Sequence, residues 1–240
     1  MTTSRYVYAV CRPFDAALQA QLTGVAGAPP RLLRHHGLVA VVSHVPTAEF
    51  DEARLRAGET DEEWLAGVAR LHQGVVDALT TVTSPLPLRP ATVFRDDSAV
   101  RLMIELREDE LRHTLDRLAG RVEWGVRVYL DEAGPGTYPD ESGPGGAEGP
   151  AQWRTRGEEF SAQLHRELSA RADRSHAYPL HHRAPGGAAG RNVLNAAYLV
   201  PRAQAEEFVE TVDRSKHTEP GILVELTGPS AAYSFAADDS

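Results

Sequence analysis

The order of strand-like and helix-like segments after Val122 constrains the fold more than any other feature of this chain. Residues 122–130 indicate a strand. Residues 151–173 indicate a helix, with Trp153, Phe160, Leu164 and Leu168 along one stripe. Strands at 175–182 and 191–200, a helix at 203–216 and a last strand at 221–226 follow. This β-α-β-β-α-β order is ferredoxin-like, with an antiparallel pair in the middle and the helices on one face of the sheet.

The first half of the chain predicts a different, mixed α+β arrangement. Residues 5–11 alternate and are rich in Tyr and Val, and the nearly continuous apolar run at 38–45 is typical of a strand buried on both faces. A capping box of Thr60 and Glu63 is expected to start the clearest helix. Its apolar residues at helical spacing are Trp64, Leu65, Val68, Leu71, Val75, Val76 and Leu79.

Two further segments complete the predicted organisation. Residues 97–118 are helical with an interruption near 107–109, and the prolines at 85 and 87 make that segment an edge strand or a covering strap. Residues 133–150 are rich in Gly and Pro and are expected to form a loop within the second domain. We therefore expect an α+β protein with an N-terminal domain at 1–120 and a ferredoxin-like C-terminal domain at 121–240.

Composition and charge exclude several classes of protein. Of the 240 residues, 42% are hydrophobic and 25% are charged, which is the balance of a soluble globular protein. The net charge of −9 argues against a nucleic-acid-binding protein, and the sequence has no apolar run of the roughly 20 residues that span a bilayer. The N-terminus has no signal-peptide profile, and Cys11 is the single cysteine. These features predict a cytoplasmic protein that contacts neither nucleic acid nor membrane.

Two pairs of adjacent histidines, His35-His36 and His181-His182, raise the question of a metal site. Adjacent residues on a strand point to opposite faces, so such a pair cannot readily chelate one ion. No cluster of Cys, Asp or Glu stands at ligand spacing beside either pair in the sequence. We therefore expect solvated histidines at strand ends and no metal site.

His72 lies on the apolar stripe of the clearest helix, one turn from Val68 and Val76. A buried histidine needs a hydrogen-bond partner and an uncharged ring, so we expect a core or interface residue. The sequence fixes no nucleophile near it, and the glycines at 186–190 lack the lysine and the following helix of a phosphate loop. The sequence thus predicts no catalytic residue and no cofactor.

Several short sequence words stand in order along the chain. They are YVY at 6–8, EWL at 63–65, LHQ at 71–73, PLPLR at 85–89, EWGVRV at 123–128, NAAYLV at 195–200, LTGP at 226–229 and YSF at 233–235. By these words the chain resembles the GvpF/GvpL family of gas vesicle proteins over nearly its whole length. Pro90-Ala91 and Ser230 depart from the family pattern, which favours an aromatic residue and a glycine at the first place and a tryptophan at the second.

The resemblance implies a bacterial, two-domain α+β protein that is an accessory or minor component of gas vesicle assembly and is associated with the vesicle. Its implied partners are the major shell protein GvpA, which is small and very apolar, and other gas vesicle accessory proteins. An acidic partner that covers the apolar surface of the shell protein before delivery would suppress its aggregation. The resemblance implies a non-catalytic function.

The apolar and family-like residues are densest in the N-terminal half, where we expect the surface that binds a partner. The residues expected there are Trp64, His72, Gln73, Leu86, Leu88, Arg89 and Phe94. The alternative is an enzyme or a small-molecule-binding protein, because a ferredoxin-like scaffold hosts many chemistries. That alternative requires a closed polar pocket in which His72 has a carboxylate partner.

Overall fold

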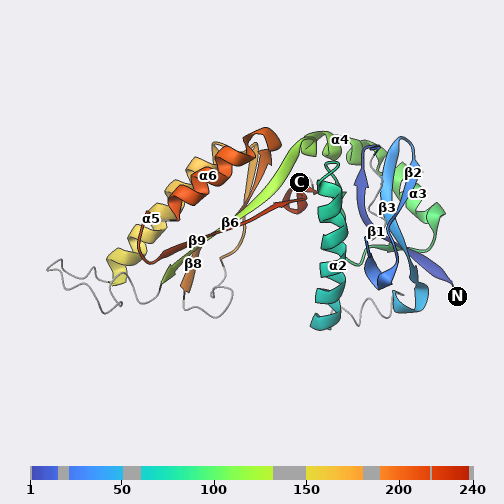
Figure 1. Ribbon diagram of the computed structural model, residues 1–240, viewed down its shortest axis with the longest axis horizontal. Helices are drawn as coiled ribbons and strands as arrows, with labels where there is room; N and C mark the ends of the chain where they lie inside the picture. Colours follow the sequence, from blue (N-terminus) through green and yellow to red (C-terminus); the bar gives the residue numbers. More distant parts are fainter. Residues whose placement is uncertain are drawn as a thin grey trace. The chain divides into compact units, whose positions relative to one another are not determined.

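The computed structural model describes residues 2–15, 22–50, 61–131, 150–180, 190–216 and 218–237. The chain divides into two compact units (Figure 1), each described separately below. The first unit is Met1–Val122 together with Ser230–Ser240, and the second is Glu123–Pro229. Within the described ranges, no helix combines the length and the apolar character needed to cross a membrane.

The first unit contains a sheet in the order β2-β3-β1-β4, and β5 also pairs with β1. Its strands are β1 (Thr3–Cys11), β2 (Arg31–His35), β3 (Leu38–Pro46), β4 (Leu86–Pro87) and β5 (Val93–Phe94). β1 and β3 run antiparallel from Thr3↔Pro46 to Cys11↔Val39, with a bulge between Val7 and Ala9. Both strands are almost entirely buried, which confirms the prediction for residues 38–45 and exceeds what the alternating sequence of residues 5–11 indicated. β4 lies at the sheet edge, which confirms the interpretation of the proline-rich segment.

The helices of the first unit are α2 (Glu62–Thr80), α3 (Asp97–Leu106) and α4 (Glu108–Leu118). α2 covers one face of the sheet, and α3 and α4 lie on the other (Figure 1). The side chain of Asp61 caps α2 by accepting a hydrogen bond from the backbone of Trp64 at 3.0 Å. The sequence predicted a capping box of Thr60 and Glu63 at this place. The N-cap residue is Asp61 instead, and Thr60 lies outside the described residues. Arg107, with φ −120° and ψ 18°, separates α3 from α4, which confirms the predicted interruption.

The second unit has the element order β6-α5-β7-β8-α6-β9 and a sheet in the order β7-β8-β6-β9. The elements are β6 (Arg121–Asp131), α5 (Pro150–Ser169), β7 (Arg174–Ala177), β8 (Gly190–Pro201), α6 (Ala205–Ser215) and β9 (Ile222–Ser230). β7 and β8 pair antiparallel, and α5 and α6 lie side by side (Figure 1). The predicted loop at 133–150 and the turn between the middle strands lie outside the described residues, apart from Pro150, where α5 begins.

The described residues also contain four short 3₁₀ helices. They are η1 (Val25–Gly27), η2 (Thr47–Glu49), η3 (Arg202–Gln204) and η4 (Tyr233–Phe235). The protein is therefore an α+β protein with two sheets, as predicted.

α5 packs very closely on β6 at Gly157. A Cβ atom at this position would lie 2.3 Å from Cδ2 and 2.9 Å from Cγ of the buried Leu130. Gly74, in α2, has no atom within 4 Å of the corresponding position. The two glycines therefore have opposite roles, since the first permits close packing and the second only weakens its helix.

We expect Gly157→Ala to lower the free energy of unfolding by about 1–3 kcal/mol, because the new methyl group overpacks the contact with Leu130. The matched control, Gly74→Ala, is expected to raise it by roughly 0.5–1 kcal/mol, since alanine is the better helix former. Urea unfolding followed by circular dichroism measures both effects. A stabilising Gly157→Ala change would contradict the close approach of α5 to β6.

Candidate interaction surface on the first unit

The structure places the seven predicted surface residues at different depths. Arg89 is exposed, and Trp64, Gln73, Leu88 and Phe94 are partly buried. His72 is only 1% exposed and Leu86 only 4%, so these two side chains lie beneath the surface. They support neighbouring residues and present almost no area of their own to a partner.

The structure does not bring all of these residues to one face. Val93 packs against the core cluster that includes Val68, Val75 and Val76 of α2. Neighbouring residues on a strand point to opposite faces, so Phe94 is directed to the side of the sheet covered by α3. α3 and β5 are in contact, in agreement with this placement. Phe94 is therefore separated from Trp64 by the sheet.

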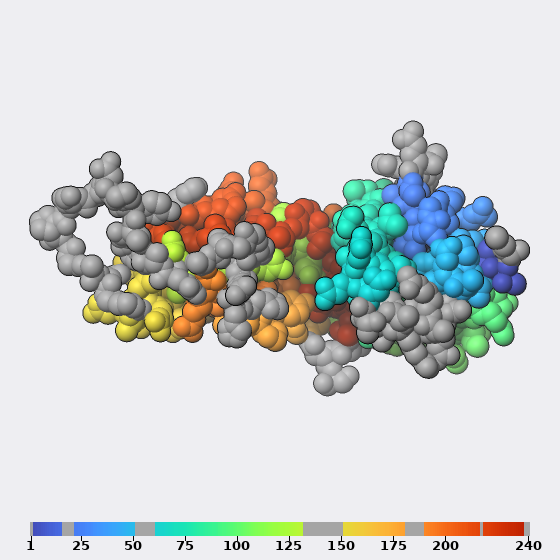
Figure 2. Space-filling model, turned by 90° about the horizontal axis from the view of Figure 1, so that it is seen from below, coloured from blue at the N-terminus to red at the C-terminus, as the bar shows by residue number. Residues whose placement is uncertain are grey.

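α2 presents more apolar side chains than its sheet covers. Leu65 is 39% exposed and Leu71 is 40% exposed, while Trp64 is partly buried against the core. Trp64 and Leu71 are seven residues apart and thus lie on the same side of the helix. Leu65 lies about 100° round the helix from Trp64, at the other edge of the buried stripe. We call Trp64, Leu65 and Leu71, which border that stripe, the α2 apolar face. Figure 2 shows α2, in teal, at the surface of the first unit.

Aromatic rings form the support beneath this face. The ring centroids of Phe50 and Trp64 lie 5.8 Å apart, and those of Phe50 and Tyr6 lie 5.9 Å apart. The His72 ring lies 5.7 Å from that of Tyr6 and 5.5 Å from that of Tyr8. These contacts join α2 to β1 through stiff side chains that have few rotatable bonds.

The Tyr6 hydroxyl connects α2 to the segment that follows β4. It lies 3.0 Å from Nδ1 of His72 and accepts a hydrogen bond from the backbone N–H of Ala91 at 3.0 Å. Two backbone bonds fasten the same segment to β1, from Leu88 N to Tyr8 O and from Val7 N to Thr92 O, both at 2.9 Å. We call residues 88–92 the strap.

The electrostatics of this connection require neutral groups. Burial lowers the pKa of His72 to about 4, with a backbone interaction with Leu88 acting in the opposite direction. Burial also raises the pKa of Tyr6, so the phenol keeps its proton and forms a hydrogen bond with Nδ1 of the neutral imidazole. The prediction of a buried His72 is confirmed, and Nδ1 has Tyr6 as its partner, whereas Nε2 is buried with no hydrogen bond of normal geometry to the described residues. Its partners are aromatic and backbone groups, which is the environment of a structural histidine.

The strap has a strained position at Ala91, whose φ of 64° lies in the left-handed region. Glycine adopts this conformation without steric cost, whereas alanine does not. A glycine, which the family pattern has at this place, suits this backbone, so alanine at position 91 introduces local strain.

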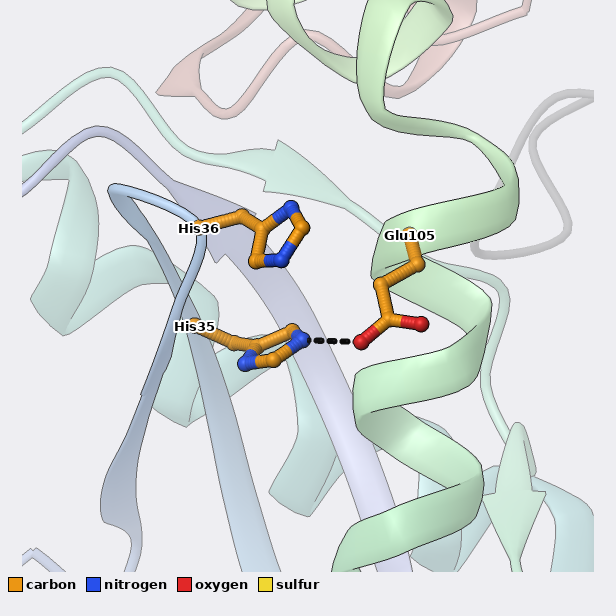
Figure 3. A group of neighbouring side chains, drawn as sticks. All are labelled: His35, His36 and Glu105. Atoms are coloured by element: carbon orange, nitrogen blue, oxygen red, sulfur yellow. Dashed lines mark hydrogen bonds and ion pairs between the residues drawn. The ribbon is translucent and has the colours of Figure 1, made fainter.

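The structure overturns the predicted arrangement of one histidine pair and describes the single cysteine. The expectation that His35 and His36 point to opposite faces is wrong, because their rings stack with centroids 4.4 Å apart (Figure 3). Burial raises the pKa of the Cys11 thiol to about 12, so this cysteine is protonated and unreactive near neutral pH. His181 and His182 lie outside the described residues.

A hollow of about 450 Å³ lies between α5 and α6 in the second unit. Its lining mixes charges of both signs with an aromatic ring, and Arg156 forms an ion pair with Glu219 at its edge. The lining includes Arg156, Glu159, Phe160, Glu167, Arg214 and Glu219. It does not contain His72, so it is not the pocket that the enzyme alternative requires.

We expect the free energy of unfolding to fall by about 2 kcal/mol through His72 when the pH is lowered from 7 to 5. The pKa of His72 is about 4 in the folded chain and 6.5 for an ordinary histidine. The unfolded chain binds more protons between these values, so the stabilisation is complete above the higher pKa and is lost as the pH falls towards the lower one.

Urea unfolding of the wild type and of His72→Gln at both pH values measures this contribution. The other histidines titrate in both chains, so the difference between the two losses isolates His72. Equal losses in the two chains would show that His72 is not the titrating group.

Comparisons with known proteins agree with the resemblance in the sequence. Residues 4–237 match the family described as "Gas vesicle synthesis protein GvpL/GvpF". The chain is 47% identical to "Gas vesicle protein L" of Streptomyces sp. (strain CB03234), over 98% of this chain and 94% of that protein. It is 27% identical to "Gas vesicle protein F" of the same strain, over 97% and 99% of the two chains.

Solved structures show the same fold. The crystal structure of the gas vesicle protein GvpF from Anabaena sp. PCC7120 aligns with a TM-score of 0.71 at 18% identity, over 100% of this chain and 98% of that one. GvpF from Microcystis aeruginosa aligns with a TM-score of 0.69 at 19% identity, over 98% and 100%. The family match over residues 4–237 of the chain and the 47% identity to a gas vesicle protein L lead to one conclusion: the chain belongs to the GvpL/GvpF family of gas vesicle synthesis proteins.

Proposed function

We propose that this protein assists gas vesicle assembly by binding the apolar major shell protein GvpA through the α2 apolar face. The observation that carries the proposal is the exposure of Leu65 and Leu71 beside Trp64, on a helix whose inner side is fixed to β1. A fully buried leucine contributes about 1.5–3 kcal/mol relative to an exposed one. Covering two half-exposed leucines and the edge of a tryptophan therefore supplies a useful part of a binding energy.

The rigid support of α2 favours this function. Tyr6 and His72 hold the inner side of the helix, so its outer side chains are presented in one arrangement and little order has to be gained on binding. In the most suitable binding mode, an apolar helix of the partner packs alongside α2 and covers its exposed apolar side chains. Arg89 is exposed on the strap. It adds a positive charge next to Leu88, whose backbone interacts with His72.

The net charge of −9 suits a carrier of an apolar protein. Charge of one sign keeps a complex dispersed while its apolar surfaces are covered. We propose that the protein acts without catalysis in the cytoplasm and on the gas vesicle, and that other gas vesicle proteins are further partners. The environment of His72, which is made of aromatic rings and backbone, supports the non-catalytic function.

We also propose that the second unit is a ferredoxin-like domain. The element order and the sheet order β7-β8-β6-β9 support this assignment. The division of the chain into domains at 1–120 and 121–240 stays a proposal, with residues 230–240 grouped with the first unit by their contacts.

Co-expression with the shell protein tests the proposed function. We expect affinity capture of the wild-type chain to retain GvpA and to keep more of it soluble. The double change Leu65→Gln and Leu71→Gln is expected to lower the captured amount about tenfold, equivalent to about 1.4 kcal/mol. Leu223→Gln is the matched control, because Leu223 is 51% exposed and lies in the second unit.

Two results would contradict the proposal. The absence of GvpA from the wild-type capture would exclude it as the partner. Capture that is equally strong in the α2 variant and the control, with both chains folded by circular dichroism, would place the binding surface elsewhere.

A further inference from the structure

We propose that His35, His36 and Glu105 form a binding site for a borderline transition-metal ion such as Zn²⁺. The three residues come from the hairpin between β2 and β3 and from α3, all within the first unit. We call them the hairpin–helix site. Figure 3 shows both imidazole rings on the side of the hairpin that faces Glu105.

The turn explains why two adjacent histidines point the same way. β2 ends at His35, which pairs with Leu38 of β3, so His36 and Gly37 form a two-residue turn. Their φ angles are 47° and 66°, both positive, as a type I′ hairpin turn requires. The left-handed conformation of His36 ends the strand alternation, and its ring stacks on that of His35 with 30° between the planes. Because His36 lies in the turn and outside the strand, both imidazole rings can face one metal ion.

The donor atoms are close enough to share one ion. One ligand atom from each of the three residues lies within 4.8 Å of the other two. Nε2 of His35 is 2.6 Å from Oε1 of Glu105. Nitrogen and oxygen ligands bind Zn²⁺ at about 2.0–2.2 Å, which separates tetrahedral ligands by roughly 3.3 Å. Metal binding would therefore require the 2.6 Å pair to separate slightly and the more widely spaced atoms to approach one another by side-chain rotation.

The donor set selects the class of ion. Two imidazoles and one carboxylate suit Zn²⁺, Ni²⁺ or Cu²⁺ and match poorly the all-oxygen preference of Mg²⁺ and Ca²⁺. Three protein ligands leave a fourth position for water or for Glu108, whose Oε2 lies 2.7 Å from Nδ1 of His36. Arg112 also binds Glu108, at 2.8 Å, which makes Glu105 the more available carboxylate.

The surroundings hold the ligands in place. Arg112 donates to the backbone carbonyl of His36, so the turn that carries both imidazoles is fastened to α4. Such outer contacts orient ligands and commonly change metal affinity by about 10–100-fold. A bound ion would cross-link the hairpin turn to α3 and stabilise the first unit by mass action.

The simpler role for these residues is structural. The bonds His35–Glu105 and His36–Glu108 tie the turn to α3 and α4 without any metal ion. Glu105→Gln separates the two roles, because glutamine keeps a hydrogen-bonding oxygen but loses the charge that makes a carboxylate a good metal ligand. A purely structural pair would show no dependence on added metal.

The experiment uses the full chain without an affinity tag, stripped with EDTA and titrated with Zn²⁺ by calorimetry. We expect one tight ion per chain and a higher thermal midpoint that EDTA reverses. Glu105→Gln is expected to weaken this binding at least about tenfold, and the double change His35→Gln and His36→Gln to abolish it. Co²⁺ in place of Zn²⁺ should give the visible absorption of a tetrahedral site.

Matched controls address the other histidines of the chain, which number ten in all. His176→Gln, in the second unit, and the double change His181→Gln and His182→Gln are expected to leave the tight site intact. Binding that is lost in the His181 and His182 variant and kept in the His35 and His36 variant would overturn the proposal. So would the absence of tight binding to the wild type, or a folded Glu105→Gln variant with unchanged affinity.

Discussion

The hydroxyl group of Tyr6 links three parts of the first unit, because it extends from β1 to α2 and to the strap. β1 lies inside its sheet and pairs with β3, β4 and β5, and Tyr6 extends from it to both His72 and Ala91. The connection contains no charge, because burial keeps the imidazole neutral and the phenol protonated. A charged group in the same place would have to be desolvated at a much higher cost. α2 and the strap thus share an uncharged polar contact, in addition to the apolar packing of α2 and the backbone hydrogen bonds of the strap.

Features that depend on a residue's own backbone or on helical spacing could be predicted from the sequence. The prolines at 85 and 87 place their segment at the sheet edge, and the stripe of α2 and the break at Arg107 follow from periodicity and local composition. β2 was missed because its sequence, RLLRH, is short and polar and becomes a strand only by pairing with β3. The turn at His36 was missed for a related reason, since a positive φ at a non-glycine residue follows from the hairpin as a whole.

The candidate surface was predicted by residue type, which does not determine depth or direction. His72 and Leu86 are buried, and Phe94 lies across the sheet from Trp64. The sequence of α3 shows two apolar pairs at the same spacing, on different sides of the helix. Val100 and Ile104 are buried in the structure, whereas Leu102 and Leu106 are exposed. α2 shows the same excess, because its apolar stripe is wider than one packed face can cover. Comparing the width of a stripe with the area available to bury it would have identified Leu65 and Leu71.

The second unit is inserted between two parts of the first. Ala231 and Tyr233 belong to the core cluster around Tyr6 and Val76, although more than a hundred residues separate them from α2 in the sequence. During synthesis, the ribosome therefore releases β1, β3 and α2 long before the residues that complete their core. The inserted unit begins in β6 and ends in β9, which are neighbours in one sheet, so its two ends lie side by side. Insertions, deletions or replacement of the second unit can accordingly leave the path of the first unit's chain unchanged.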